Sequence, residues 1–335
     1  MRTCVRCTRW LLLFSAVSGR IGAGEPASRP ADPGEVLKRC QSYLDAQQWD
    51  AADRASSRGL QAFPESVDLW MVRVDVALRQ GHWATALERV AAAEARLGVQ
   101  PALDMRAGQA YFGLDRLLGD VAVRSVPDGR VGQITPGWLL LEQRGAGRFL
   151  CCSEDSALYR VRRALAGGAA DVAVDVLHAR IWQSLGKPEV GLALLQVREA
   201  ELLASPDSGT LELAMELALA AGEPEAYLRY ARARAELAGD RRDELLGEAY
   251  GALAEYYGRL GDTALHREFG ARAVRLSPDQ PELLLRLGDA AWLAGQRAEA
   301  ARHYRELLKR APDHRESSRA RERLADWEQA GRPEP

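Results

Sequence analysis

The chain has 335 residues, of which 47% are hydrophobic, and this length suits either two globular domains or one long array of repeats. The 45 basic and 47 acidic residues nearly cancel, which leaves a formal net charge of -2. Nucleic acids and anionic membranes bind through a strong positive field, so this balance argues against both as partners.

The first residues are typical of an export signal. Arg2, Arg6 and Arg9 precede an apolar run, residues 10–17, which is too short to cross a bilayer as a helix. Small residues suitable for cleavage follow, either Ala16 and Ser18 or Gly22 and Gly24. We therefore expect a signal peptide over 1–24, a linker over 25–33, and a periplasmic or secreted protein; the alternative is a disordered cytoplasmic tail. No other stretch has the ~20 apolar residues of a transmembrane helix.

The cysteines do not form a disulfide framework. Removal of the signal peptide would take away Cys4 and Cys7 and leave three, an odd and small number. Cys4 and Cys7 have CxxC spacing, but the strand and helix of a redox motif are missing around them. We expect stability to come from packing, and we leave open whether Cys40, Cys151 and Cys152 form a disulfide.

From residue 34 onward the sequence repeats with a period of 34 residues. Near the C-terminus Leu253, Gly261 and Pro278 recur as Leu287, Gly295 and Pro312, and near the N-terminus the same spacing relates Tyr43, Ala52, Ala77, Ala86 and Tyr111. Each unit contains two helical stretches of about a dozen residues joined by a short turn. Five turns carry a glycine that can adopt a left-handed conformation, and these are Gly81, Gly186, Gly222, Gly261 and Gly295.

A small residue often follows five positions after the turn glycine, where it lets two helices approach closely. Ala86, Gly191 and Ala300 are examples, whereas Tyr227 and His266 occupy the corresponding places in the middle units. Ala86 and Ala300, together with Trp70, Gly81, Leu287, Gly288, Gly295, Tyr304 and Pro312, resemble the tetratricopeptide repeat consensus, from which Tyr227 and His266 depart. The resemblance implies an all-α, right-handed superhelical solenoid of antiparallel helix pairs over 34–118 and 153–312. HEAT or Sel1-like repeats remain an alternative for the degenerate middle.

Residues 119–152 interrupt the repeats, because Pro127, Asp128, Gly129, Pro136 and Gly137 are incompatible with a continuous helix. Apolar runs at 138–143 and 148–152 flank a glycine-containing segment, which predicts a β-hairpin inserted in the third repeat. Ser153 resembles the N-cap of the helix that completes this repeat. The hairpin could carry binding specificity, or its apolar residues could cover an edge of the array. After the last repeat we expect a capping helix within 313–330 and a mobile tail over 331–335.

The resemblance also implies where a partner would bind, because the first helices of such repeats line a concave groove. On this mapping one end of the groove carries Asp68, Met71, Asp75 and Arg79, and the other carries Glu248, Glu255, Arg259, Glu282, Arg286 and Asp289. Some family members hold a peptide carboxylate with lysine and asparagine, but the matching places here carry Met71, Asp75, Glu255 and Asp289. We expect a protein or peptide partner of basic or mixed charge; the alternative is that these charges form a solvated helix face.

The motifs of catalysis and of cofactor binding are missing. There is no phosphate-binding glycine loop with lysine, no HExxH and no GxSxG, and the five histidines show no ligand spacing. We expect no enzyme, cofactor, metal or small-molecule substrate. The predicted function is a non-catalytic protein-interaction scaffold. The alternatives are an accessory subunit of an envelope polysaccharide or protein export assembly, and a thiol enzyme that uses Cys151 or Cys152 with His178 as base.

Overall fold

The computed structural model describes residues 32–127, 138–144, 146–278 and 280–329. The predicted signal peptide (1–24), the linker before residue 32 and the tail (331–335) lie outside these residues, as do Asp128, Gly129, Pro136 and Gly137. The chain divides into two compact units, Met1–Val72 and Arg73–Pro335. Each unit is described by itself.

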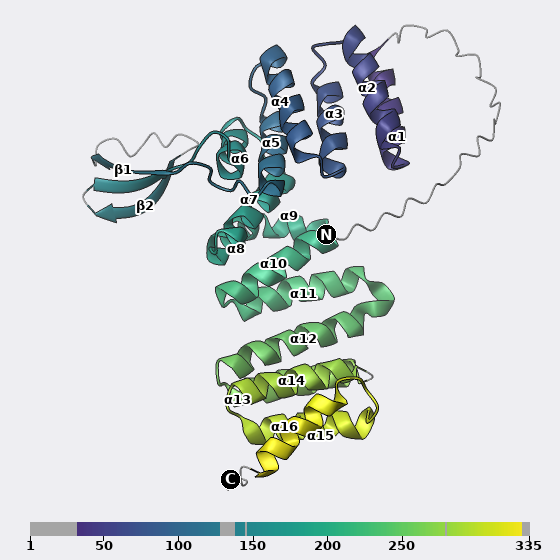
Figure 1. Ribbon diagram of the computed structural model, residues 1–335, viewed down its shortest axis with the longest axis vertical. Coiled ribbons are helices and arrows are strands. Elements are labelled where there is room, and N and C mark those ends of the chain that lie inside the picture. Colours follow the sequence, from purple (N-terminus) through teal and green to yellow (C-terminus); the bar gives the residue numbers. More distant parts are fainter. Residues whose placement is uncertain (1–31, 128–137, 145, 279, 330–335) are drawn as a thin grey trace, which may run out of the picture. The chain divides into compact units, whose positions relative to one another are not determined.

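Helices dominate both units (Figure 1), which confirms the predicted all-α class. The first unit holds α1 (Pro33–Asp45), α2 (Trp49–Ala62) and the start of α3 (Val67–Arg79). The second unit holds the rest of α3, then α4 (Trp83–Leu97), α5 (Pro101–Gly113), α6 (Ala157–Ala166), α7 (Val172–Ser184), α8 (Pro188–Val197), the short α9 (Glu199–Ala204), α10 (Ser208–Ala221), α11 (Pro224–Leu237), α12 (Arg242–Arg259), α13 (Thr263–Leu276), α14 (Pro281–Leu293), α15 (Arg297–Arg310) and α16 (Ser317–Gln329). Neighbours in sequence pack as pairs, among them α1 with α2, α10 with α11 and α14 with α15.

The turns inside the pairs share one backbone geometry. The five predicted turn glycines all have positive φ, between 70° and 80°, which confirms their role. In each turn the next N–H donates to the carbonyl five residues earlier, as His82 does to Ala77 at 2.8 Å and Gln296 does to Ala291 at 2.9 Å. This bond ends the first helix and starts the return of the chain. Gln47 and Asp115 hold the same conformation without glycine, at φ 55° and 57°.

Small residues sit where the paired helices approach each other. Ala52, Ala86 and Ala300 are fully buried at this position. At Gly191 an added Cβ would lie 2.9 Å from the carbonyl oxygen of Ala179, so the close contact requires glycine. The middle repeats depart from this rule, because Tyr227 and His266 occupy the equivalent places and are themselves buried.

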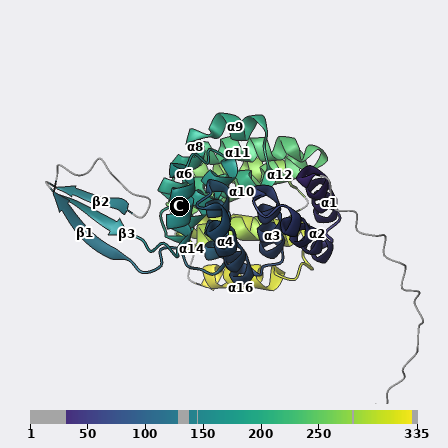
Figure 2. The same cartoon turned by 90° about the horizontal axis from the view of Figure 1, so that it is seen from above.

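The insertion forms a small antiparallel sheet with the strand order β1-β3-β2. Strands β2 (Trp138–Arg144) and β3 (Ala146–Cys151) are the predicted hairpin, and β1 (Ala122–Pro127) is an additional strand that the sequence analysis missed. Figures 1 and 2 both show the sheet projecting to one side of the helices of its unit. Its residues therefore cover little of the helical array.

The sheet has a small core of its own. The Phe149 side chain is only 2% exposed, and its ring lies edge-on to that of Trp138 with centroids 6.0 Å apart. An added Cβ at Gly147 would meet the Phe149 ring at 2.6 Å, so this glycine makes room for the ring. Val123 and Leu140 stay exposed on the described part of the sheet.

The two ends of the insertion meet at one point of the third repeat. Ser153 N–H donates to the Leu118 carbonyl at 3.1 Å, and Ala157 N–H donates to that of Arg116 at 2.9 Å. Consequently α5 and α6 pack as a helix pair although the sheet separates them in sequence. The N-cap of α6 is Ser156, whose Oγ accepts from Tyr159 N–H. The expectation that Ser153 caps this helix is therefore wrong.

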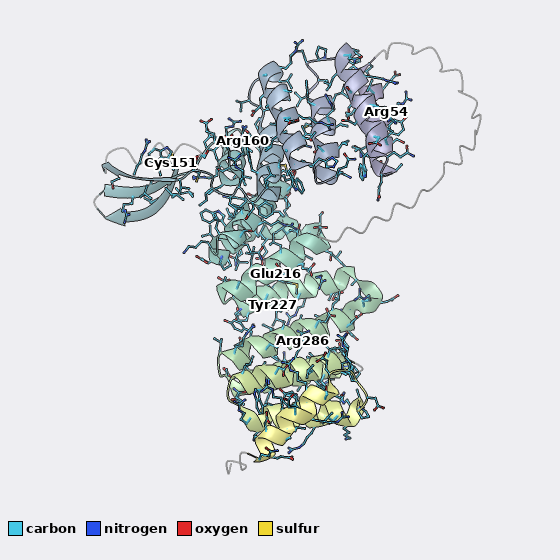
Figure 3. All side chains as sticks on the ribbon, viewed as in Figure 1. Arg54, Cys151, Arg160, Glu216, Tyr227 and Arg286 are labelled. Carbon is cyan, nitrogen blue, oxygen red and sulfur yellow. The ribbon has the colours of Figure 1, made fainter. Side chains whose placement is uncertain are left out.

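Buried charges also hold α6 in place. Asp104 on α5 is fully buried and accepts from Arg163 Nε at 2.7 Å and from Arg160 Nη1 at 3.0 Å. Glu94 on α4 accepts from the same two arginines, and Arg160 is labelled in Figure 3. The network ties three helices together beside the base of the sheet.

The last helix covers the final repeat. In α16 the buried side chains Ala320 and Leu324 pack with Tyr304 and Leu307 of α15. This is the capping role that the sequence predicts for residues 313–330. Within the ranges that the structure describes, no helix combines the length and the hydropathy that a membrane crossing needs.

Candidate protein-binding site

A pocket of about 940 Å³ lies on the first helices of consecutive repeats in the second unit. It is formed by the C-terminal half of α3, by the first residue of α4, by α5 and α7, and by the start of α10. Its apolar wall includes Trp83, Met105, Phe112 and Val176. Trp83 reaches this wall because Gly113 has no side chain; an added Cβ there would lie 2.5 Å from the indole.

The carboxylates of the pocket already have partners within the chain. Asp75 accepts two hydrogen bonds from Arg106, at 2.6 and 2.8 Å, which is the two-pronged geometry of a strong ion pair. Asp171 and Asp207 cap the N-termini of α7 and α10 by accepting from Ala173 N–H at 3.1 Å and Thr210 N–H at 2.8 Å. The bonds from Thr210 lower the pKa of Asp207, and the nearby Arg180 adds to this effect.

Two other polar groups face solvent in the pocket. Arg180 and Gln109 are exposed, and among the described residues neither has a hydrogen-bond or ion-pair partner. The pocket thus combines an apolar wall, hydrogen-bonded carboxylates and a guanidinium group that can donate hydrogen bonds to a ligand. Such a surface suits a peptide segment better than a small charged metabolite.

The structure places only part of the predicted groove residues in this pocket. Asp75 and Arg79 line it, whereas Asp68 and Met71 belong to the first unit. The sequence analysis missed Met105, Arg106, Gln109 and Arg180. Met105 and Gln109 follow Met71 and Asp75 by one 34-residue period, so extending the repeat register into the third repeat would have found them.

The predicted residues at the other end of the groove lie on α12 and α14. Glu255 pairs with Arg286 at 2.6 Å, and Figure 3 labels Arg286. Glu282 accepts from His314 at 2.8 Å. Asp289 accepts from Tyr304 Oη at 2.7 Å and pairs with Arg319 at 2.9 Å. These contacts join each first helix to its neighbours, and the role of this surface in binding, with Glu248 and Arg259, stays a prediction.

The buried Cys152 does not have the electrostatic environment that a catalytic thiolate needs. Cys40, Cys151 and Cys152 are free thiols. Burial raises the pKa of Cys152 to about 11, although Arg162 opposes the shift. Burial, with a smaller contribution from Arg162, lowers the pKa of His178 to about 4. At neutral pH the Cys152 thiol stays protonated, whereas catalysis needs a thiolate.

Three potential metal ligands come together elsewhere in the second unit. His266 on α13 and Glu299 and His303 on α15 are buried and adjacent. The sequence analysis did not pair them, since two lie on one helix and the third lies one repeat earlier. The spacing Glu299-x-x-x-His303 places both on one helix face and was the available signal.

Solved tetratricopeptide repeat proteins have a similar fold. The C-terminal part of a TPR repeat-containing protein from Cytophaga hutchinsonii superposes with a TM-score of 0.53 at 8% identity, over 85% of this chain and 98% of its own. A tetratricopeptide repeat protein from Parabacteroides merdae has 12% identity and a TM-score of 0.43, over 88% and 97% of the two chains. No protein-family model and no curated protein sequence matches. The first likeness supports the tetratricopeptide fold predicted from the repeat residues.

Proposed function

We propose that this chain, with its tetratricopeptide fold, is a non-catalytic scaffold that holds a segment of a partner protein in the pocket on α3, α5, α7 and α10. The observation that carries the proposal is the pocket itself, which combines an apolar wall with an exposed arginine. Repeat arrays present their first helices to extended or helical ligands, because the stacked core leaves that face free.

The partner segment should carry an apolar side chain next to a carboxylate. Met105, Phe112 and Val176 offer contact to the apolar group, and Arg180 offers charge-assisted hydrogen bonds to the acid. The charge of Asp75 is offset by Arg106, whereas Asp171 and Asp207 accept backbone N–H bonds and keep a negative charge that a basic residue of the partner could meet. We therefore expect a partner segment of mixed charge with at least one acidic residue, which is narrower than the basic or mixed charge predicted from the sequence.

The test uses peptides selected by display against the full chain. Their affinity would be measured by fluorescence anisotropy for the wild type, Arg180→Glu and the matched control Arg232→Glu, an exposed arginine on the second helix α11. The proposal expects Arg180→Glu to weaken binding at least about tenfold, the size of one lost charge-assisted contact, and the control to change nothing. Equal effects of both variants would reject this pocket.

A photo-crosslinking residue at Gln109 gives an independent measurement. Gln109 is exposed in the pocket, and a second crosslinker at Glu88, exposed on the second helix α4, serves as the control. A full-length partner identified in cells should crosslink from Gln109 and not from Glu88. Crosslinking from Glu88 alone would place the interface on another face.

The absence of catalysis is also testable. Alkylation of the three thiols of the described chain under native conditions should leave peptide binding unchanged, because burial keeps Cys40 and Cys152 away from reagents. A loss of binding on modification of the half-buried Cys151 alone would require a different function for this region.

The export of the chain is a further proposal, supported by Arg2, Arg6 and Arg9 and by the short apolar run that follows. Intact-mass measurement of the protein from its host should show a mature N-terminus near Glu25, in a periplasmic or secreted fraction. A full-length chain in the cytoplasmic fraction would contradict it.

A further inference from the structure

The cluster of His266, Glu299 and His303 lies far from the proposed partner pocket in sequence, on the second helices α13 and α15 of neighbouring repeats. His266 is 0%, Glu299 3% and His303 6% exposed. One ligand atom from each side chain can be chosen so that all three lie within 4.8 Å of one another. Two imidazoles and a carboxylate in this arrangement need an explanation, because buried polar groups are normally paired.

The hydrogen bonds fix the tautomer of His266 and leave its second nitrogen able to bind a ligand. His266 Nδ1 lies 2.8 Å from the carbonyl oxygen of Ala254, so this nitrogen carries the proton and Nε2 presents a lone pair. His266 Nε2 and His303 Nε2 are both buried without a hydrogen-bond partner among the described residues. His303 Nε2 is 3.5 Å from Glu299 Oε1.

The backbone is adapted to hold the first imidazole. His266 stands where most other repeats have alanine or glycine, and Gly258 on α12 lies opposite it. A Cβ on Gly258 would approach His266 Nδ1 to 3.0 Å, so the missing side chain leaves space for the ring. The bond to a backbone carbonyl is the usual outer partner of a metal-bound histidine, which fixes the tautomer and the ring orientation.

We propose that His266 Nε2, His303 Nε2 and a carboxylate oxygen of Glu299 bind one divalent transition-metal ion, zinc in the first place. Nitrogen and carboxylate ligands suit zinc, and three protein ligands leave one tetrahedral position for a water molecule. Ligands at ~2.1 Å from a tetrahedral ion lie about 3.4 Å apart, so small side-chain rotations from the present separations close the site.

The surrounding charges are compatible with an ion. Arg267 Nε donates to Glu299 Oε2 at 2.7 Å and Arg302 to Oε1, which orients the carboxylate while each oxygen keeps a second lone pair. Both arginine side chains are more than half exposed and can turn toward water when a cation binds.

Such an ion would join two repeats. The ligands come from α13 and α15, so binding would add a cross-link between the second helices of the last two complete repeats. Binding only to the folded chain would raise the Tm by on the order of 3 °C at a zinc concentration about 100 times the Kd.

The experiment titrates zinc into the full chain after treatment with a chelator, with isothermal calorimetry as the readout. We expect one zinc per chain, and at least about a tenfold to hundredfold loss of affinity in His266→Gln and in His303→Gln. The matched control is His178→Gln, which removes another buried imidazole whose two nitrogens have no partner. Circular dichroism shows whether each variant keeps its helices.

Cobalt as the probe metal separates this site from the cysteines. A nitrogen and carboxylate site gives weak visible bands, whereas thiolates add an intense near-ultraviolet transition from sulfur to cobalt. Visible bands without the sulfur transition in the wild type, lost in Glu299→Gln, would support the proposal even if a histidine variant failed to fold. A sulfur transition alone, no binding, or unchanged affinity in folded His266→Gln and His303→Gln would overturn it.

Discussion

The Asp104 carboxylate lies in the interior of the third repeat between two guanidinium groups. It has no exposed surface, while Arg160 and Arg163 are 13% and 21% exposed. A buried ion pair contributes little when it is complete, but the loss of one partner leaves the other charge without compensation. Asp104 therefore fixes the position of α6 more than it adds stability.

Removal of this carboxylate should be costly. We expect Asp104→Ala to lower the free energy of unfolding by about 3 kcal/mol, because two partly buried arginines are then left with Glu94 as their one shared carboxylate partner. Glu88→Ala, an exposed acid on α4, should change stability by less than about 0.5 kcal/mol. Urea denaturation followed by circular dichroism makes both measurements, and a similar small change in the two variants would contradict the role of the network.

The buried His178 predicts a loss of stability in acid. Its pKa is about 4 in the folded chain against 6.5 in the unfolded chain, because burial and then Arg162 disfavour the charged ring. As the pH falls, the unfolded state binds the proton at a higher pH than the folded state. The free energy of unfolding is therefore unaffected above about pH 6.5 and falls progressively down to about pH 4. The expected total is on the order of 3 kcal/mol. His178→Leu should flatten this part of the stability profile, and His82→Gln, an exposed imidazole, should not.

At the level of elements, the turns at Gln47 and Asp115 show what the repeat requires. Both residues adopt a left-handed backbone that glycine adopts in the other turns. A residue with a Cβ is strained in this region by roughly 1–2 kcal/mol, part of which is offset because glycine is more flexible in the unfolded chain. The sequence thus keeps the turn geometry at some cost.

Glycine at the first of these turns should stabilise the protein. We expect Gln47→Gly to raise the free energy of unfolding of the first unit by about 0.5 kcal/mol, and Gln47→Ala to give no gain, since alanine keeps the strain. Thermal denaturation of the two variants compares them directly. A gain with alanine as large as with glycine would show that the backbone angle is not the cause.

The inserted sheet should be separable from the helices. Replacement of 120–151 by two glycines joins ends that already meet through the bond from Ser153 N–H to the Leu118 carbonyl. We expect the helical circular dichroism signal and peptide binding to persist. The Tm should fall by only a few degrees, because the bond from Arg162 to the Trp138 carbonyl is lost. Loss of the helical signal would mean that the sheet is part of the core.

Elements that depend on nearby residues were predicted from the sequence, and elements that depend on distant residues were missed. The turn glycines and the strands β2 and β3 follow from nearby residues, and the structure confirms them. Strand β1 was missed because its pairing partner β3 is distant in sequence, with β2 between them. The cluster at His266 was missed for the same reason, since packing between repeats brings its members together.

For the whole molecule, the array implies stability that accumulates between neighbours. Each repeat buries its apolar face on the next, so damage at one end should remain local. The repeat register predicted only two residues of the candidate pocket, Asp75 and Arg79. Arg180 stands six residues before the turn glycine Gly186, as Asp75 does before Gly81, so counting back from Gly186 would have found it although the insertion breaks the 34-residue period.

Deletion of 313–335 tests this locality. Loss of α16 exposes Tyr304 and Leu307, so we expect faster hydrogen exchange in α14 and α15 and a lower Tm for this end. Peptide binding at the Arg180 pocket should be unchanged, because α7 and α10 keep their neighbours. Equal acceleration of exchange in α5 and α7 would show that the second unit unfolds as one cooperative block.

Arg162 links the inserted sheet to the buried His178. Its guanidinium group donates to the Trp138 carbonyl in the sheet, and its charge adds to the effect of burial in lowering the pKa of His178. If the sheet swung away from α6, Arg162 would turn toward water and the imidazole would titrate at a higher pH. An NMR titration of His178 would then report whether the sheet is docked on α6.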